Sequence, residues 1–465
     1  MRFASRQNPW VGVTALVGVM AAWMAGGPFH IWHSSDSLIP ILVSLQRWTP
    51  FYWAQDRYGM LVPLLAIPVR DPLMNLLLQG WVMTVAGLLA PFLMARCVTS
   101  DPHRWFIAGA TANLLLLALA QINVQFDWLV VQPYGLSLSL AAVAIVIAQR
   151  PGRFNLTASV VLMVLAHWVN LSVFVVIGAM ILLRRPLSWR ALASATIGVT
   201  TGDALTSLTD VHTPSTLLSP REWPHAWSQL LASVLTPLNH TVLFVIAVAA
   251  TAGAIVLFLR RAERRAVEMA AVLLATGMVH WLVTGTSSWV QINLYFPRYL
   301  YPSVAMAALA VGIIASALLE EWRRWTPPIL ATALVALTIV DYGRPSLTAL
   351  RTSLDKKFGA MTSDVLTSGA AVIGGDYWTV WPAVFHANLA LYRQDRRAVV
   401  YALAFRSEIT NPLWTTRMTD IRVAAAPGDR KVEGWMNTIP LSIERIEHHG
   451  TLDLFVTRTA AAARQ

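Results

Sequence analysis

The sequence predicts a mainly α-helical protein that crosses a membrane many times, and three features carry this prediction. Only 13% of its 465 residues are charged and 56% are hydrophobic, whereas about a quarter of a typical soluble chain is charged. Charge-free apolar stretches recur along the chain, many of them near the roughly 20 residues that a helix needs to cross hydrocarbon. The arginines fall in short clusters between these stretches. A chain of this kind uses lipid as its solvent.

The spacing of the apolar stretches predicts about eleven transmembrane helices. The segment 154–183 is charge-free between arginines on both flanks, too long for one crossing and short for two. Because flanking arginines favour the cytoplasmic side, we expect it to form a hairpin of two short helices that turns at residues 167–170. The other expected spans are residues 10–27, 73–96, 105–122, 128–148, 188–206, 240–259, 266–286, 299–318 and 325–341.

The arginine clusters predict the orientation of the chain. All of them reach the same side if residues 154–183 form a hairpin, which places the N-terminus in the cytoplasm and the C-terminal tail outside. We expect an uncleaved signal anchor at the start rather than a signal peptide, because no small-x-small cleavage site follows the first apolar stretch. The pattern is typical of a protein of the bacterial inner (plasma) membrane. The net charge of +11 follows from this topology, so no nucleic-acid partner is expected.

Two domains are expected, a transmembrane domain over residues 1–341 and a small extracytoplasmic α/β domain over residues 342–465. The charge density rises to a soluble level after Asp341. Strands are predicted near residues 370–373, 399–405 and 452–457, with a helix over 378–392. The sequence Gly374-Gly375-Asp376-Tyr377-Trp378 is interpreted as a turn and helix cap.

Asp36 is the first candidate catalytic residue. It follows the first expected span, at the level where the membrane meets water, and a partly desolvated carboxylate there suits proton transfer from an acceptor hydroxyl. The alternative is structural, because Ser34 to Ser37 before an apolar run is a good helix start. Both interpretations stay open. His33, in the same segment, and His167, in the expected hairpin, are candidates for contacting the substrate.

Asp56, Arg57 and Tyr58 form a second candidate group in the first external segment. A planar guanidinium is well suited to bind a lipid phosphate, and the alternative is a local ion pair at the membrane interface. Asp127 is the only formal charge between Arg104 and Arg150. An isolated acid at a membrane boundary is a functional candidate.

Arg298 is the only formal charge between Glu268 and Glu320, in the aromatic and proline-rich segment 295–302. A guanidinium at the outer end of a helix, next to Tyr299, is suited to bind a phosphate or pyrophosphate oxygen. The alternative is an anchor in the interfacial aromatic belt. The histidines show no metal-ligand spacing.

This arrangement resembles the GT-C superfamily of polytopic membrane glycosyltransferases, which use polyprenyl-phosphate sugars as donors. The resemblance rests on a long first external loop with Asp36, a second loop with Asp127, and the later Pro297-Arg298-Tyr299 segment with Pro302. It implies that Asp36 is the catalytic base or a metal-binding group and that Arg298 lies near the donor phosphate. The sequence has Asp36-Ser37 where the superfamily commonly has two acids. Asp56 is therefore a substitute candidate, and participation of a divalent cation stays open.

The leading functional hypothesis is transfer of a hexosyl or pentosyl group from a polyprenyl-phosphate donor, in the membrane lipid, to an extracytoplasmic acceptor in the cell envelope. A second hypothesis is a transporter or lipid flippase, although the expected spans carry few charges and no internal repeat is visible. A third is a non-catalytic envelope scaffold, in which Asp36 and Arg298 would be dispensable.

Overall fold

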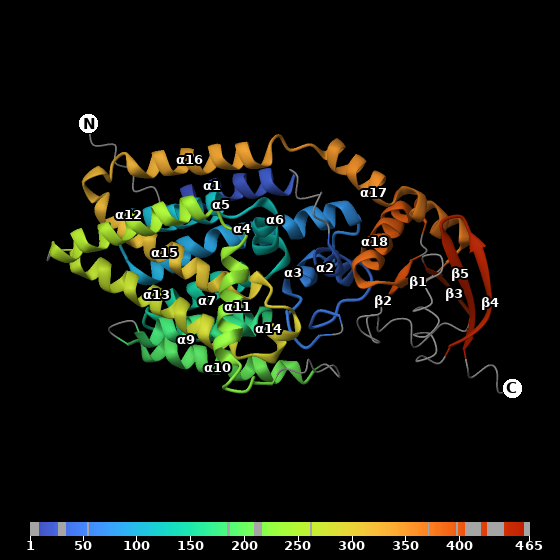
Figure 1. Ribbon diagram of the computed structural model, residues 1–465, viewed down its shortest axis with the longest axis horizontal. Helices are drawn as coiled ribbons and strands as arrows, with labels where there is room; N and C mark the ends of the chain where they lie inside the picture. The colour runs from blue at the N-terminus through green and yellow to red at the C-terminus, as the bar shows by residue number, and fades with distance from the viewer. Residues whose placement is uncertain are drawn as a thin grey trace. The chain divides into compact units, whose positions relative to one another are not determined.

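The structure is a computed structural model (Figure 1), and it describes most of the chain. The described residues are 9–26, 34–53, 55–183, 187–208, 216–260, 263–370, 372–396, 399–404, 420–425 and 441–459. The chain divides into two compact units. The first unit contains Met1–Met24, Arg57–Gly59 and Trp81–Arg344, and the second contains Ala25–Asp56, Met60–Gly80 and Pro345–Gln465.

The first unit contains helices joined by loops and turns, and no strand of the sheet falls within its described residues. Its helices are α1 (Pro9–Ala25), the larger part of α4 (Pro72–Val98), α5 (Pro102–Leu119), α6 (Ile122–Phe126), the π-helical turn η2 (Asp127–Val131), α7 (Tyr134–Ala148), α8 (Arg153–Val169), η3 (Leu171–Val173), α9 (Phe174–Leu183), α10 (Trp189–Thr206), α11 (Trp223–Leu235), α12 (His240–Leu259), α13 (Arg264–Gly285), α14 (Ser288–Ile292), η5 (Pro297–Leu300), α15 (Tyr301–Leu318), η6 (Glu320–Trp322) and α16 (Thr326–Tyr342).

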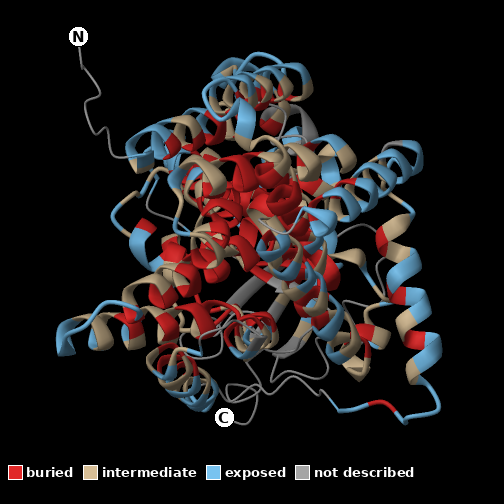
Figure 2. Cartoon of the chain, turned by 90° about the vertical axis from the view of Figure 1, so that its left-hand side faces the viewer, coloured by how far each residue is buried: buried red, intermediate tan, exposed pale blue. Residues whose placement is uncertain are grey.

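Small residues allow the inner helices of this unit to pack closely. A Cβ atom on Gly312 of α15 would overlap the carbonyl group of Ala108 on α5, so the two backbones are in contact. Close backbone approach at small residues is the usual way in which membrane helices pack, since burial from lipid provides little hydrophobic driving force. Trp105 and Phe92 are fully buried around this contact. Figure 2 shows the buried residues on inner helices and the exposed residues on outer ones.

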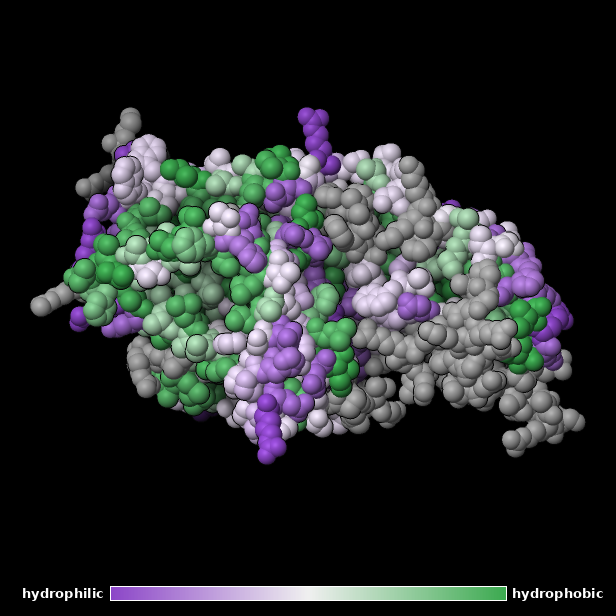
Figure 3. All heavy atoms as spheres, in the orientation of Figure 1, coloured by the Kyte–Doolittle hydropathy of each residue, from purple (hydrophilic) through white to green (hydrophobic). Residues whose placement is uncertain are grey.

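The outer helices expose apolar side chains, as expected for surfaces that contact lipid. Hydrophobic residues cover much of the surface over α12 and α13 in Figure 3. The large exposed side chains include Phe244, Val245, Val248, Ile255 and Phe258 on α12 and Leu274, Met278 and Val283 on α13.

Four helices within the described residues are long and apolar enough to cross a membrane, or up to six if each of two bent helix pairs forms one span. The four are Pro72–Val98, Arg264–Gly285, Pro297–Leu318 and Thr326–Leu354. They match expected spans at 73–96, 266–286, 299–318 and 325–341. The chain is therefore compatible with an integral membrane protein, but the expected number of about eleven transmembrane helices is wrong.

The missing spans have identifiable physical causes. The stretch expected to cross at residues 128–148 breaks at Pro133, and the helices on either side, Ile122–Val131 and Tyr134–Ala148, meet at 54°. Proline removes a backbone donor and so interrupts the helix. Helix α1 has 17 described residues. Helix α5 spends its first turn on Pro102, His103 and Arg104.

The helical hairpin between two arginine clusters is confirmed. Arg153–Val169 and Leu171–Leu182 are bent by 118° at a short break. Asn170 lies at that break with an extended backbone, and its side-chain oxygen accepts a hydrogen bond from the Ser172 N–H group at 3.1 Å. A side-chain acceptor at such a position caps the first turn of the following helix. The turn therefore falls within the expected residues 167–170.

The second unit combines helices with a five-stranded mixed sheet. Its helices are α2 (Ser35–Leu45), α3 (Leu61–Ala66), the start of α4, α17 (Leu347–Ser368) and α18 (Tyr377–Arg393), and its strands are β1 (Val372–Gly375), β2 (Tyr401–Ala404), β3 (Asp420–Ala425), β4 (Leu441–His449) and β5 (Leu452–Thr459). The strand order is β2-β1-β3-β5-β4. Strand β1 is parallel to β2 and β3, and β5 is antiparallel to β3 and β4. The expected small C-terminal sheet is present.

Candidate functional site

Asp36 lies in the first turn of α2, whose N-cap residue is Ser34. The Ser34 N–H group donates to Ser37 Oγ at 3.1 Å, so the serines start the helix. The expected helix start is therefore confirmed, but Asp36 is not its N-cap. The carboxylate instead takes part in a cluster of hydroxyl groups.

Two tyrosines hold the Asp36 carboxylate. The Tyr377 hydroxyl donates to Asp36 Oδ1 at 2.6 Å, and the Tyr52 hydroxyl lies 3.5 Å from the same oxygen. The two hydroxyl groups are 2.9 Å apart. Short hydrogen bonds to a charged acceptor are about twice as strong as neutral ones. Residues 36, 52 and 377 therefore form one polar cluster in the second unit, which we call the carboxylate–tyrosine cluster.

A buried network of hydrogen bonds stabilises α2, the helix that carries Asp36. Ser44 Oγ donates to Asn75 Oδ1 at 3.0 Å, and Gln79 Nε2 donates to the same oxygen at 2.7 Å. Gln79 Nε2 also lies 3.3 Å from the Pro40 carbonyl oxygen. Pro40 lies inside α2 and has no N–H group to donate to the carbonyl of Asp36. The network thus stabilises a helix that lacks one of its backbone hydrogen bonds.

The first unit contains a cluster of cations and aromatic rings. The Arg57 guanidinium lies 3.8 Å from the Trp289 ring centroid, and Trp289 Nε1 donates to the Tyr299 hydroxyl at 3.0 Å. The Arg298 guanidinium lies 5.4 Å from the Tyr299 ring centroid and 5.1 Å from that of Phe296. Both arginines therefore pack on one connected aromatic group, and we call these residues, with Tyr58, the arginine–aromatic cluster. Four of the residues selected from sequence meet here: Arg57, Tyr58, Arg298 and Tyr299.

The backbone around the arginine–aromatic cluster is strained. Tyr58, Leu294 and Tyr295 have φ angles of 61°, 55° and 53°, in the left-handed region that residues with a Cβ rarely adopt. Strained residues of this kind gather at functional sites, where the surrounding structure holds them. Next to Tyr58, the Gly59 N–H group donates to the Trp168 carbonyl at 2.9 Å, at the tip of the hairpin, and a Cβ on Gly59 would overlap that carbonyl.

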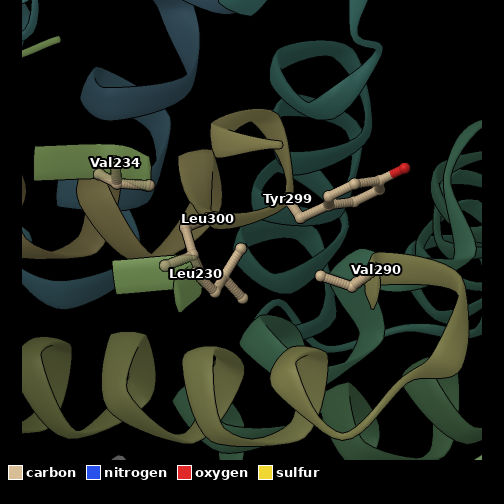
Figure 4. Close-up of a cluster of buried hydrophobic side chains, with 5 residues drawn as sticks. All are labelled: Leu230, Val234, Val290, Tyr299 and Leu300. Atoms are coloured by element: carbon tan, nitrogen blue, oxygen red, sulfur yellow. The ribbon is translucent and has the colours of Figure 1, made fainter. Parts of the chain in front are cut away.

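A small apolar core supports Tyr299. Leu230 and Val234 of α11, Val290 of α14 and Leu300 of η5 pack with it (Figure 4). Tyr299 is 6% exposed, and its hydroxyl points away from the leucines in Figure 4. The ring is thus fixed from one side while its hydroxyl accepts the hydrogen bond from Trp289.

Asp127 is linked to the same region through Tyr301. The Tyr301 hydroxyl donates to Asp127 Oδ2 at 3.0 Å, and its ring packs on Trp128 with 5.3 Å between centroids. Arg298 lies three residues before Tyr301 in the chain. Asp127 starts the π-helical turn η2, a form of helix that often marks functional sites. The structure therefore brings Asp127 and Arg298 into one neighbourhood.

An apolar cavity of about 370 Å³ adjoins this neighbourhood. Helices α5, α6, α11, α12, α13 and α15 and the turn η2 contribute to its walls, and Pro297, Tyr301 and Trp128 are among its lining residues. The few polar side chains in the wall are Asn113, Gln125, Thr251 and Tyr301. Its size is at the lower end of the range for small-molecule sites. The cavity can accept an apolar chain, and two of its lining residues, Trp128 and Pro297, directly adjoin Asp127 and Arg298 in the sequence.

Two of the three remaining candidate residues, Asp56 and His167, lie within the described residues. Asp56 is half-buried in the second unit, in the loop before Arg57. His167 is buried in α8, where its Nδ1 atom lies 2.8 Å from the Met163 carbonyl oxygen and its ring packs against Gly198 of α10. His33 lies outside the described residues. Substrate contact by the two histidines stays a prediction.

A divalent cation does not fit the carboxylate–tyrosine cluster. Its donors are one carboxylate and two tyrosine hydroxyls, whereas Mg²⁺ and Ca²⁺ are bound mainly by carboxylates, carbonyls and water. Across the described residues, no group of three or more His, Cys, Asp or Glu side chains is arranged to hold a metal ion.

Sequence reasoning missed the tyrosines that hold the acids. Tyr377 lies in the segment interpreted as a turn and helix cap, and Asp376 does cap α18 by accepting a hydrogen bond from the Trp378 N–H group at 3.3 Å. Tyr301 lies in the aromatic segment around Arg298, but nothing in the sequence pairs it with Asp127. Only the tertiary structure reveals these partners.

No protein-family model and no curated protein sequence matches this chain.

Proposed function

We propose that the protein is a membrane glycosyltransferase that transfers a sugar from a polyprenyl-phosphate donor to an acceptor hydroxyl outside the cytoplasm. One observation carries the proposal: an apolar cavity among the helices of the first unit is lined by Pro297 and Tyr301, the residues on either side of the Arg298-Tyr299-Leu300 segment. An apolar cavity whose lining residues flank an arginine in the chain supports a ligand with a lipid chain and a phosphate. A polyprenyl phosphate has this chemistry.

The arginines supply the charge that the donor requires. A guanidinium binds phosphate oxygens with two parallel hydrogen bonds. Arg57 and Arg298 both pack on the faces of aromatic rings, and such packing orients each cation. As the bond between the anomeric carbon and the phosphate oxygen breaks, negative charge grows on the phosphate. Prearranged cations stabilise that charge.

Asp36 supplies the base. In the proposed step the acceptor hydroxyl transfers its proton to Asp36 while its oxygen forms a bond to the anomeric carbon. The bond from that carbon to the phosphate oxygen breaks, and polyprenyl phosphate leaves with the electron pair. A direct displacement of this kind inverts the anomeric centre. The proposal requires Asp36 to be accessible to the acceptor on the outer side of the membrane.

The test is a transfer assay in membranes with a panel of radiolabelled polyprenyl-phosphate hexoses and pentoses. The parent is compared at equal expression with Asp36→Asn and Arg298→Ala. The matched controls are Asp376→Asn, since asparagine also caps helices, and Arg324→Ala, whose guanidinium lies 5.3 Å from the Trp325 ring centroid. We expect transfer with one donor, lost in the first two variants and retained in the controls. Unchanged transfer in both site variants would remove the site assignment.

A transporter is the second candidate, and the helix breaks favour it. The pairs bent by 118° and 54° resemble the broken helices around which transporters bind their substrates. The same membranes distinguish the two functions. Absence of transfer with every donor, together with movement of a labelled lipid-linked sugar across sealed vesicles, would favour the transporter.

A further inference from the structure

Tyr377 contacts α2 at two neighbouring residues, within the second unit. Its hydroxyl donates to Asp36 Oδ1 at 2.6 Å, and its backbone carbonyl accepts a hydrogen bond from Ser35 Oγ at 2.6 Å. Asp36 and Tyr377 are 341 positions apart in the chain. One residue near the C-terminal end therefore fixes both the helix that carries the acid and the acid itself.

Tyr377 is itself held firmly. It is the first residue of α18, directly after the cap residue Asp376 and the strand β1, which lies between β2 and β3 in the sheet. Its side chain is only 6% exposed. The Tyr52 hydroxyl, 2.9 Å from that of Tyr377, adds a second polar contact. A side chain with so many constraints can hold a partner in one orientation.

We infer that Tyr377 is a positioning residue that orients the Asp36 carboxylate for proton transfer, and that the C-terminal α/β segment is thereby part of the catalytic site. This inference rests on the proposed function. A base that is oriented by a third group is a recurrent arrangement in enzymes. A displacement of about 1 Å in such a group lowers rates by about 100-fold. The hydroxyl of Tyr377 prevents that displacement.

The test substitutes Tyr377→Phe in the full chain, held in lipid nanodiscs. This change keeps the ring and the backbone carbonyl that binds Ser35, so the packing of α18 is retained. Tyr392→Phe is the matched control, because it makes the same change on the same helix at a side chain that is 46% exposed. We expect Tyr377→Phe to lower kcat by about 10- to 100-fold, with the KM for the donor and the thermal midpoint unchanged, and Tyr392→Phe to behave as the parent.

A double substitution separates positioning from a merely structural role. If Tyr377 acts through Asp36, then adding Tyr377→Phe to Asp36→Asn causes no further loss, because the base is already absent. If its role is structural, the two losses multiply. Multiplying losses, or parental kcat in Tyr377→Phe, would overturn the inference while leaving the proposed function intact. A parent that transfers from no donor would overturn both.

Discussion

Two clusters, one in each unit, hold opposite charges with aromatic side chains. In the first unit, the ring faces of Trp289 and Tyr299 hold the guanidinium groups of Arg57 and Arg298. In the second unit, the hydroxyls of tyrosines hold the carboxylate of Asp36. A tyrosine can thus stabilise a cation through its face and an anion through its hydroxyl. Substitutions that keep the face and remove the hydroxyl should affect the two clusters differently.

The two clusters also have different roles in the proposed reaction. The arginine–aromatic cluster, beside an apolar cavity, is suited to binding a lipid phosphate, whereas the carboxylate–tyrosine cluster is suited to moving a proton. Variants of the first should raise the KM for the donor, whereas variants of the second should lower kcat and leave that KM unchanged. If variants of the second also raised the donor KM, the separation of the two roles would be wrong.

The largest effect is expected for Asp36→Asn. Removing a general base lowers kcat by about 10²- to 10⁴-fold. Donor binding should be retained, because Asp36 is not part of the arginine–aromatic cluster. Steady-state transfer at several donor concentrations measures both constants, with Asp376→Asn as the control. A raised KM with parental kcat would contradict the assignment of Asp36 as the base.

Arg298→Ala should have the next largest effect. Loss of a charge-assisted hydrogen bond costs about 1.5 to 3 kcal/mol, which corresponds to an increase in donor KM of about 10- to 100-fold. Arg324→Ala, which also removes an arginine packed on a tryptophan ring, should leave the KM unchanged. Equal effects of the two variants would show that the arginines act on membrane association rather than on the donor.

Tyr299→Phe separates the role of the aromatic ring face from that of the hydroxyl group. The variant keeps the ring face that contacts Arg298 and loses only the acceptor for Trp289 Nε1, a hydrogen bond worth about 1 kcal/mol. Donor KM should therefore rise by no more than about fivefold. Tyr299→Leu, which removes the face, should raise it further. Titration of donor binding to both variants measures the difference in their affinity for the donor. Identical affinities would show that the ring face of residue 299 plays no role in donor binding.

The first unit should also lose stability when its ionic network is broken. Arg104 donates to both carboxylate oxygens of Glu263, at 3.0 and 3.1 Å, and to Glu320 at 3.2 Å. The hydrogen bond to Glu263 is the main cause that raises the pKa of Arg104. We expect Arg104→Met to cost about 1 kcal/mol, seen as a lower thermal midpoint in nanodiscs. Arg323→Met, which removes a more exposed pair with Glu320, should cost less.

The smallest effect concerns pH and the second unit. Hydrogen bonds from the Thr451 hydroxyl and N–H group, both at 2.7 Å, lower the pKa of Asp364. Because this pKa is lower in the folded chain than in the unfolded one, the contribution to stability is complete above the unfolded pKa. It is lost as the pH falls through the folded pKa. The thermal midpoint of Thr451→Ala should thus lie below that of the parent at pH 7, and the difference should shrink on acidification.

Particular residues show how far the sequence determines the fold. The candidate spans α4, α13, α15 and α16 were predictable because each contains a long charge-free stretch, and the break within residues 154–183 was predictable because arginines flank that segment on both sides. The break at Pro133 was not predicted, since the apolar stretch continues across it. Strands β3 and β4 also escaped prediction. Strand β4 contains Glu444, Arg445 and Glu447, and it forms against β5 through tertiary pairing.

The site was predictable only in part, for a related reason. Isolated charges in apolar surroundings indicate Asp127 and Arg298 as candidates, and Asp127 accepts a hydrogen bond from Tyr301, three residues after Arg298. The partners of Asp36 could not be predicted, because a contact across 341 positions leaves no local pattern. Residue type and spacing therefore reveal the charged groups, whereas the tertiary structure reveals what holds them.

The central claim is that one chain binds a lipid-linked sugar and then transfers it with Asp36 as the base. A single-turnover experiment tests this most directly: radiolabelled donor is bound to the parent and to Asp36→Asn in nanodiscs, acceptor is added, and bound donor and product are counted in the same sample. We expect equal donor binding by the two proteins and a loss of transfer of about 100-fold or more in Asp36→Asn. Transfer by Asp36→Asn at the parental rate, or a parent that binds no donor, would contradict it.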